Sequence, residues 1–178
     1  LRKASPGVYV DLSAFAKGHA VDEVSELLDA RALQDYLVEI GGEMRMRGSN
    51  ARSEPWAIAI ETPDRSGRSV QTVLHLSDAA MATSGDYRNF FEHEGRFYSH
   101  TIDPRTGYPV THNGASVTVV ADTAAFADAA ATALLVLGPE AGMELAERVS
   151  IAAYFLLRFG SEFEERMSSL FATKVLKK

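Results

Sequence analysis

The sequence predicts a single domain built from both β-strands and α-helices. Its 178 residues suffice for one domain with a real core. Trp56–Glu61 and Val70–Leu76 alternate apolar and polar residues around turn residues, which predicts an antiparallel hairpin. The alanine-rich stretch Ala124–Leu137 ends at Gly138-Pro139, a helix stop signal, and is apolar enough to be buried. Hairpin strands and separate helices together predict a mixed domain.

Composition excludes several classes of function. Apolar residues make up 46% and charged residues 24%, with a net charge of -6, as in globular proteins with a mildly acidic surface. Lys and Arg form no basic stripe, so nucleic acid is not an expected partner. The lack of cysteine excludes disulfides and thiolate sites. No apolar run approaches the ~20 residues that span a bilayer, and Leu1-Arg2-Lys3 does not begin a signal peptide.

The N-terminal part is predicted to run strand, loop, helix. Gly7–Asp11 favours a short strand, Leu12–Gly18 a loop of small residues, and an amphipathic helix continues to about Ala30. One face of this helix carries Val21, Val24, Leu27 and Leu28. A loop that enters a helix N-terminus suits an anion, and Lys17 adds charge there. The alternative is a plain connection without a ligand, because the glycine pattern is neither a P-loop nor a Rossmann motif.

The other predicted elements follow local patterns. A compact turn is expected at Ser84-Gly85-Asp86, and a polar helical turn before Phe171–Leu176. His75 is expected to point outward without a role. A further helix is expected at Glu140–Val149. Strands are expected at Tyr36–Ile40, at Glu43–Arg47 after a Gly41-Gly42 bend, at Ser116–Ala121 and at Ile151–Arg158.

The segment Phe97–Pro109 carries chemistry-bearing residues at the end of a predicted strand. His100, Asp103 and Arg105 place a base, an acid and an anion-binding cation within one short segment. Such a mixture suits phosphate chemistry. The structural alternative is a strand that ends in an Asp-Pro turn beside a partly exposed histidine.

Asp128 and Thr132 lie four residues apart in the alanine-rich helix, hence on one face. A carboxylate among alanines is costly to bury unless its charge is compensated. A cation, an arginine or backbone N–H groups would each provide compensation. A hard divalent cation suits a carboxylate with a hydroxyl one turn away. The alternative is a structural aspartate that bonds a loop.

Three segments together resemble the ApbE family of FAD:protein FMN transferases, in the family's order and spacing. They are V-D-L-S-A-F-A-K-G-H-A-V-D at Val10–Asp22, A-T-S-G-D-Y-R-N-F-F-E at Ala82–Glu92 with Y-S-H-T-I-D-P-R-T-G-Y-P at Tyr98–Pro109, and F-A-D-A-A-A-T-A-L-L-V-L-G at Phe126–Gly138. The resemblance extends from about Gly7 to Leu176 and includes Gly41-Gly42-Glu43. It implies an α+β fold with largely antiparallel sheets flanked by helices, a T-fold-like architecture. Residues 1–178 would form one such domain that lacks the N-terminal half of the family.

The resemblance also implies a reaction. Family members split FAD at its diphosphate with Mg²⁺, transfer FMN to a Ser or Thr hydroxyl of an acceptor flavoprotein, and release AMP. Mn²⁺ and Ca²⁺ favour similar oxygen ligands. The implied acceptors are subunits of membrane-bound redox complexes or nitrous-oxide respiration factors. The implied location is the periplasm or the outer face of the bacterial inner membrane, with a lipid-anchored full-length protein.

By position, the resemblance assigns roles to individual residues. The implied metal ligands are Asp128, Thr132 and the backbone carbonyl of Ala14. The implied FAD contacts are Asp11, Lys17 and the backbone near Ile102. The implied catalytic base is His100, since imidazole changes charge near neutral pH, and Asp103 would orient it. The chain departs from the family at His19, where tyrosine is common.

Two other functions are compatible with the sequence. A Mg²⁺-dependent FAD pyrophosphatase would give FMN and AMP to water instead of to an acceptor. A non-catalytic flavin-binding protein would keep the ligand site without the reaction. Retention of His100, Asp128 and Thr132 argues against this second alternative, because a site without chemistry has no need of a buried aspartate.

Overall fold

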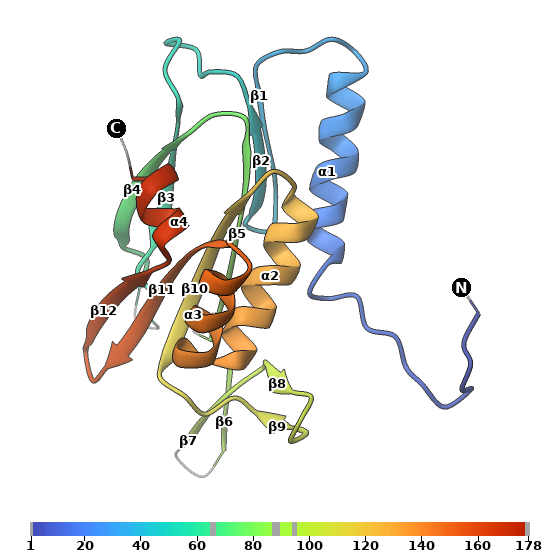
Figure 1. The fold of residues 1–178 in the computed structure, drawn as a ribbon, viewed down its shortest axis with the longest axis vertical. Helices are drawn as coiled ribbons and strands as arrows, with labels where there is room; N and C mark the ends of the chain where they lie inside the picture. Colours follow the sequence, from blue (N-terminus) through green and yellow to red (C-terminus); the bar gives the residue numbers. More distant parts are fainter. Residues whose placement is uncertain (1, 65–66, 87–89, 94–95, 177–178) are drawn as a thin grey trace.

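The computed structural model describes residues 2–64, 67–86, 90–93 and 96–176 (Figure 1). Its centre is a six-stranded sheet in the order β1-β2-β5-β10-β11-β12, in which every pair is antiparallel. The predicted α+β class is therefore confirmed. The strands of this sheet are β1 (Tyr36–Ile40), β2 (Glu43–Arg47), β5 (Ala79–Gly85), β10 (Gly114–Ala121), β11 (Ala152–Phe159) and β12 (Glu162–Met167).

Four helices and three small hairpins complete the described part of the chain. None of the helices described is long and apolar enough to span a membrane. The helices are α1 (Ala16–Asp29), α2 (Ala124–Leu137), α3 (Pro139–Arg148) and α4 (Ser169–Lys174). The hairpins are β3 (Trp56–Glu61) with β4 (Val70–Leu76), β6 (Phe90–His93) with β7 (Arg96–Ser99), and β8 (Ile102–Asp103) with β9 (Tyr108–Pro109).

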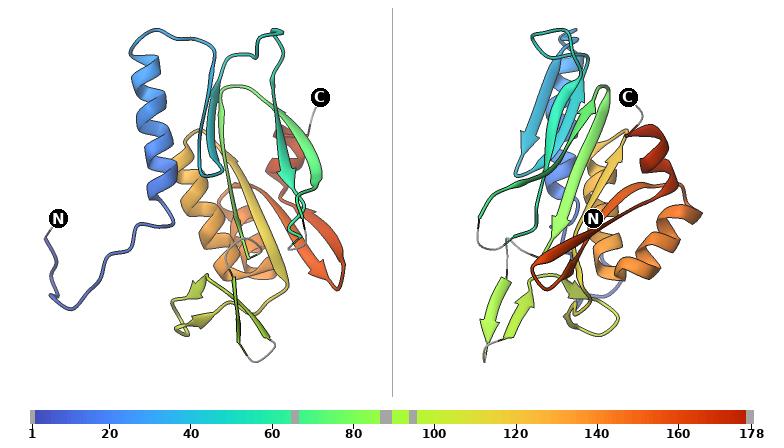
Figure 2. Two further views of the ribbon diagram at one scale, coloured as in Figure 1. Left: turned by 180° about the vertical axis from the view of Figure 1, so that it is seen from behind. Right: turned by 90° about the vertical axis from the view of Figure 1, so that its left-hand side faces the viewer.

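The sheet lies between two apolar layers (Figure 2). In strand β11, for example, buried residues alternate between the two faces of the sheet. Phe155 and Leu157 join the core formed with α2 and α3. Tyr154 and Leu156 join the core formed with the β3–β4 hairpin and α4. A strand buried on both faces explains the continuous apolar run that predicted it.

Helix α1 packs closely against α2 through small and polar residues. A β-carbon at Gly18 would lie 2.3 Å from the carbonyl oxygen of Ala124, so only glycine permits this approach. The predicted apolar face is only partly correct, because Val24 and Leu27 are 40% and 53% exposed. The buried residues of α1 are Gly18, Val21, Asp22 and Ser25.

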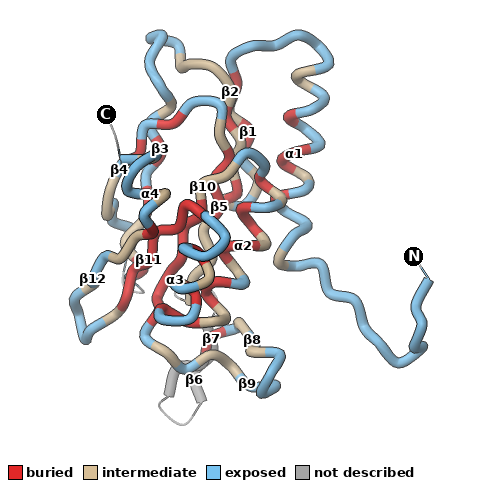
Figure 3. The backbone as a smooth tube through the Cα atoms, in the orientation of Figure 1, coloured by how far each residue is buried: buried red, intermediate tan, exposed pale blue. Residues whose placement is uncertain are grey.

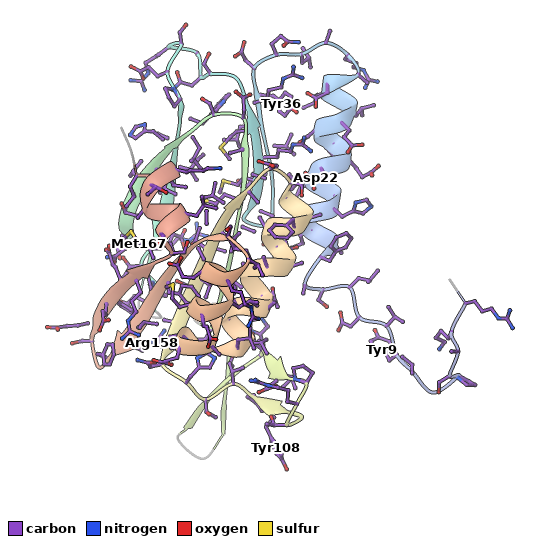
Figure 4. The ribbon with its side chains drawn as sticks, viewed as in Figure 1. Tyr9, Asp22, Tyr36, Tyr108, Arg158 and Met167 are labelled. Atoms are coloured by element: carbon purple, nitrogen blue, oxygen red, sulfur yellow. The ribbon has the colours of Figure 1, made fainter. Side chains whose placement is uncertain are left out.

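The predicted strand at Gly7–Asp11 is wrong. Residues 2–13 are exposed coil that runs away from the body of the protein (Figures 1 and 3), and Tyr9 points into solvent (Figure 4). A strand requires a neighbour for its backbone hydrogen bonds, and the described residues place none beside this arm. Local β propensity alone was therefore insufficient.

Two other predictions are corrected by strand pairing. Ser84 and Gly85 continue β5 instead of forming a compact turn, because they pair with Val117 and Ser116 of β10. The polar segment Glu162–Met167 forms the edge strand β12, since it completes a hairpin with β11, and the helical turn predicted before Phe171 is limited to the start of α4 at Ser169. Both segments lack an apolar pattern of their own and take their conformation from a neighbouring strand.

Candidate cation and nucleotide site

Asp128 of α2 lies at the first turn of α1. Its Oδ2 accepts the backbone N–H of Gly18 at 3.0 Å, and the residue is only 3% exposed. Helix α1 has no side-chain cap of its own, because the preceding residue is Phe15. Asp128 therefore supplies from another helix an acceptor for an otherwise unpaired amide. A cation, an arginine or backbone N–H groups could compensate its charge, and the structure shows a backbone N–H at one of its two oxygens.

No basic side chain pairs with Asp128 among the residues that the structure describes. Its second oxygen, Oδ1, likewise makes no hydrogen bond within that part of the chain. A single amide compensates a buried carboxylate only in part. Asp128 therefore combines a structural cap with an oxygen and a charge that remain available to a ligand.

Asp22 of α1 makes the reciprocal contact at the start of α2. Its two oxygens accept the N–H groups of Ala124 and Ala125 at 3.0 and 2.8 Å. Arg45 donates to Oδ1 at 2.9 Å. Figure 4 shows Asp22 between the two helices. This carboxylate is fully compensated and holds the helices together.

Lys17 and Glu43 form an ion pair beside this junction. Lys17 Nζ donates to Glu43 Oε1 at 2.6 Å, with side-chain exposures of 47% and 2%. Burial raises the pKa of Glu43, Lys17 opposes that rise, and the charge of Asp128 adds to it. A β-carbon at Gly41 would lie 3.3 Å from Lys17 Cδ, so the bend leaves room for the lysine side chain. The predicted phosphate-binding lysine thus lies at the start of α1 with its amine anchored.

The predicted metal ligands have the chemistry of a hard-cation site. Thr132 lies one turn after Asp128, and its hydroxyl bonds Ser84 Oγ at 2.8 Å. Gly18 donates to Asp128 and not to the carbonyl of Ala14, its partner in a regular helix. Carboxylate, hydroxyl and carbonyl oxygens are the donors that Mg²⁺ prefers. Within the described ranges no three His, Cys, Asp or Glu side chains gather as a metal cluster, so these mixed donors would have to serve.

The predicted catalytic loop lies at the other end of α2. His100 is exposed, two residues before β8 begins. Asp103 binds the guanidinium of Arg105 through both carboxylate oxygens, at 2.9 and 2.8 Å, and this pairing lowers the pKa of Asp103. The structure therefore shows Asp103 holding the turn, whereas its orientation of His100 stays a prediction.

An open depression of about 470 Å³ lies between this loop and the end of α2. Its walls include Asp103, Arg105, Tyr108 and Val136. Val136 follows Asp128 by two turns, so the depression lies ~12 Å along the helix from the acid. A larger depression of about 820 Å³ near α4 is lined by none of the predicted site residues. Tyr108, which lines the smaller depression, points outward in Figure 4.

Two of the predicted FAD contacts, Asp11 and Ile102, lie away from the α1–α2 junction. Asp11 belongs to the exposed arm, where hydrogen bonds from Ser13 lower its pKa. Ile102 is exposed on β8, next to α2. His19 stacks on Phe15 with ring centroids 5.6 Å apart. The structure thus places Lys17 and Asp128 at the first turn of α1, Asp11 in the N-terminal arm, and His100 and Ile102 at β8.

Sequence reasoning missed three residues of this region. Glu43, Asp22 and Ser84 are all buried or half-buried partners of predicted residues or of their helices. The acid that follows Gly41 and Gly42 in the sequence was a signal for Glu43. Nothing local indicated Asp22, because Arg45 is 23 residues away along the chain and the two backbone amides are 102 and 103 residues away.

Comparison with known proteins matches the model of the ApbE family to residues 1–155. The FAD:protein FMN transferase of Haemophilus influenzae is 48% identical over 172 residues, covering 96% of this chain and 50% of the relative. That of Vibrio cholerae is 47% identical over 171 residues, covering 96% and 51%. The chain thus spans about half the length of the curated relatives it matches.

Solved structures of ApbE proteins share the fold of this chain. The flavin transferase ApbE from Vibrio cholerae superposes with a TM-score of 0.85 at 44% identity, covering 96% of this chain and 54% of that one. The flavinyl transferase ApbE from Pseudomonas stutzeri gives 0.80 at 45% identity, covering 91% and 50%. The ApbE protein from Thermotoga maritima gives 0.82 at 32% identity, covering 94% and 53%. Sequence and fold therefore agree that this chain belongs to the ApbE family.

Proposed function

We propose that the chain is part of an enzyme that transfers FMN from FAD to a Ser or Thr hydroxyl of an acceptor flavoprotein and releases AMP. The observation that carries this proposal is Asp128, buried among alanines without a basic partner in the described residues. The names of the relatives supply the substrate, FAD, and the transferred group, FMN.

Asp128, Thr132 and the Ala14 carbonyl would hold a divalent cation, with Mg²⁺ the first choice and Mn²⁺ or Ca²⁺ as alternatives. When bound, the cation would neutralise charge that develops on the diphosphate. Lys17 is half exposed at the start of α1, where an ammonium group and a helix N-terminus both favour an anion. These residues therefore suit a diphosphate that lies across the α1–α2 junction.

In the transfer, the acceptor oxygen bonds to the phosphorus of the FMN half while the diphosphate P–O bond breaks. AMP leaves with the bridging oxygen, and the hydroxyl proton passes to a base. We assign that base to His100, because it is an exposed imidazole on the loop beside the smaller depression. The Asp103–Arg105 pair would shape the loop that presents it.

We propose the same environment for the protein as the family implies. Its acceptors would be flavoproteins of membrane-bound redox complexes, reached from the periplasm or the outer face of the inner membrane. A lipid anchor on the full-length protein would keep enzyme and acceptor at one surface, which raises the effective concentration of each for the other.

Mass spectrometry of an acceptor peptide incubated with FAD, Mg²⁺ and the protein tests the proposal. Transfer adds the mass of FMN to the peptide, whereas hydrolysis releases FMN and AMP without modifying it. Replacement of Asp128 by Ala should abolish cation-dependent AMP release, while Glu144→Ala on exposed α3 serves as the control. Full activity in the Asp128 variant would show that the cation binds elsewhere. FAD titration with and without Mg²⁺ would show whether this chain alone binds the nucleotide.

A further inference from the structure

Glu43 is a buried acid with no assigned role in the proposed function. Its side chain is 2% exposed, and only Oε1 is paired, with Lys17. Oε2 is buried and has no hydrogen-bond partner among the described residues. Buried polar atoms are nearly always paired, because an unpaired one costs the full desolvation penalty. The unpaired oxygen therefore indicates a ligand that the polypeptide itself does not provide.

The charges around Glu43 do not balance. Asp22 is paired with Arg45, so among the residues that the structure describes Glu43, Asp128 and Lys17 are counted together. Two negative charges and one positive charge give a net charge of about -1 in a mostly buried region. Glu43 pairs with Lys17 and Asp128 accepts the N–H of the next residue, Gly18, so both carboxylates contact the first turn of α1. A bound cation would remove this imbalance and pair the free oxygens of both acids.

We propose that Glu43 and Asp128 form a two-carboxylate site for a hard divalent cation, with Glu43 Oε2 facing the cation or a water bound to it. This inference rests on the proposed function, because Asp128 is shared. Lys17 occupies Oε1, which leaves Oε2 as the oxygen that would bind the cation. Glu43 is then a binding residue that raises cation affinity through charge and an additional oxygen.

Mn²⁺ binding to the chain without FAD tests this site, measured by electron paramagnetic resonance or calorimetry. Glu43→Gln keeps the size of the side chain and removes its charge, and it should weaken Mn²⁺ binding by about 10-fold or more. Glu144→Gln makes the same chemical change at an exposed position on α3 and should leave affinity within about 2-fold of the parent. Asp128→Asn should abolish binding.

Lys17→Gln should change Mn²⁺ affinity in the opposite direction. It removes the competing positive charge while its amide can still donate to Glu43, so Mn²⁺ should bind several-fold more tightly. Misfolding cannot mimic this gain. Unchanged affinity in Glu43→Gln, with binding lost in Asp128→Asn, would overturn the role of Glu43 alone. Parental affinity in Asp128→Asn would overturn the cation site and the proposed function with it.

Discussion

The two ends of the α1–α2 contact use the same device with different outcomes. At one end Asp22 of α1 accepts the first amides of α2, and at the other Asp128 of α2 accepts an amide of α1. Asp22 also pairs with Arg45, whereas Asp128 has no basic partner among the described residues. Two equivalent caps therefore differ in how completely their charge is compensated.

The difference separates a fully paired acid from the one that we propose as a cation ligand. A carboxylate whose oxygens are all paired, as in Asp22, contributes to stability and offers nothing to a ligand. A carboxylate with a single amide partner keeps an oxygen and a charge for a cation, at some cost to stability. Both side chains are nearly fully buried, at 6% and 3% exposure, so what distinguishes them is the set of partners.

Gly18→Ala should have the largest effect on stability, because it disturbs both ends at once. The added β-carbon would lie 2.3 Å from the Ala124 carbonyl oxygen, which forces the helices apart. We expect a loss of about 3 kcal/mol or more in the free energy of unfolding, measured by urea denaturation. Gly67→Ala is the control, since a β-carbon there meets nothing within 4 Å. Equal stability of the two variants would mean that the close helix contact is dispensable.

Asp22→Asn should cost about 2 kcal/mol by the same measurement. The amide oxygen can replace one acceptor, but the other N–H of α2 loses its partner and Arg45 loses its ion pair. Mn²⁺ affinity should remain near that of the parent, because Asp22 has no free oxygen. A loss of Mn²⁺ binding in a folded Asp22→Asn protein would contradict the separation of roles.

Asp128→Asn is the matched change at the other end and should alter stability by no more than about 1 kcal/mol. The asparagine oxygen can still accept the Gly18 N–H, and removing an uncompensated charge offsets part of any loss. Urea denaturation of both asparagine variants under one condition gives the comparison directly. A larger stability loss at Asp128 than at Asp22 would reverse the assignment.

Arg105→Gln extends the comparison to Asp103 at the end of β8. It should have the smallest effect of these substitutions on stability. Arg105 lowers the pKa of Asp103, so its removal should raise that pKa toward the ordinary aspartate value. The stabilisation from the pair is present above the ordinary pKa and is lost as pH falls through the lowered one. Carboxyl NMR titration of Asp103 measures this shift. An unchanged pKa would show that the loop is held by other contacts.

Much of the architecture followed from local pattern. The β3–β4 hairpin, helix α2 with its Gly138 end and the apolar strand β11 were predictable because periodicity and stop signals are local. The arm at residues 7–11, the continuation of β5 and the edge strand β12 were not, because a strand exists only where a neighbour pairs with it.

The candidate site divides in the same way. Asp128 and Thr132 were identified from their spacing on an apolar helix, and His100 and Asp103 from their place at the end of a strand. Glu43 acquires its significance only when the chain folds, since Lys17 lies 26 residues away along the sequence. The pairing of Asp103 with Arg105, by contrast, joins residues only two positions apart.

The sequence by itself determined the residue types that can bind a cation and a diphosphate, and the helix that carries the buried acid. Only the tertiary structure decided which acids are neutralised and which keep a free oxygen. The physical reason is that compensation of a buried charge depends on distances across helices and strands. Asp22 and Asp128 are both aspartates on helices, and only the fold brings an arginine to the first of them.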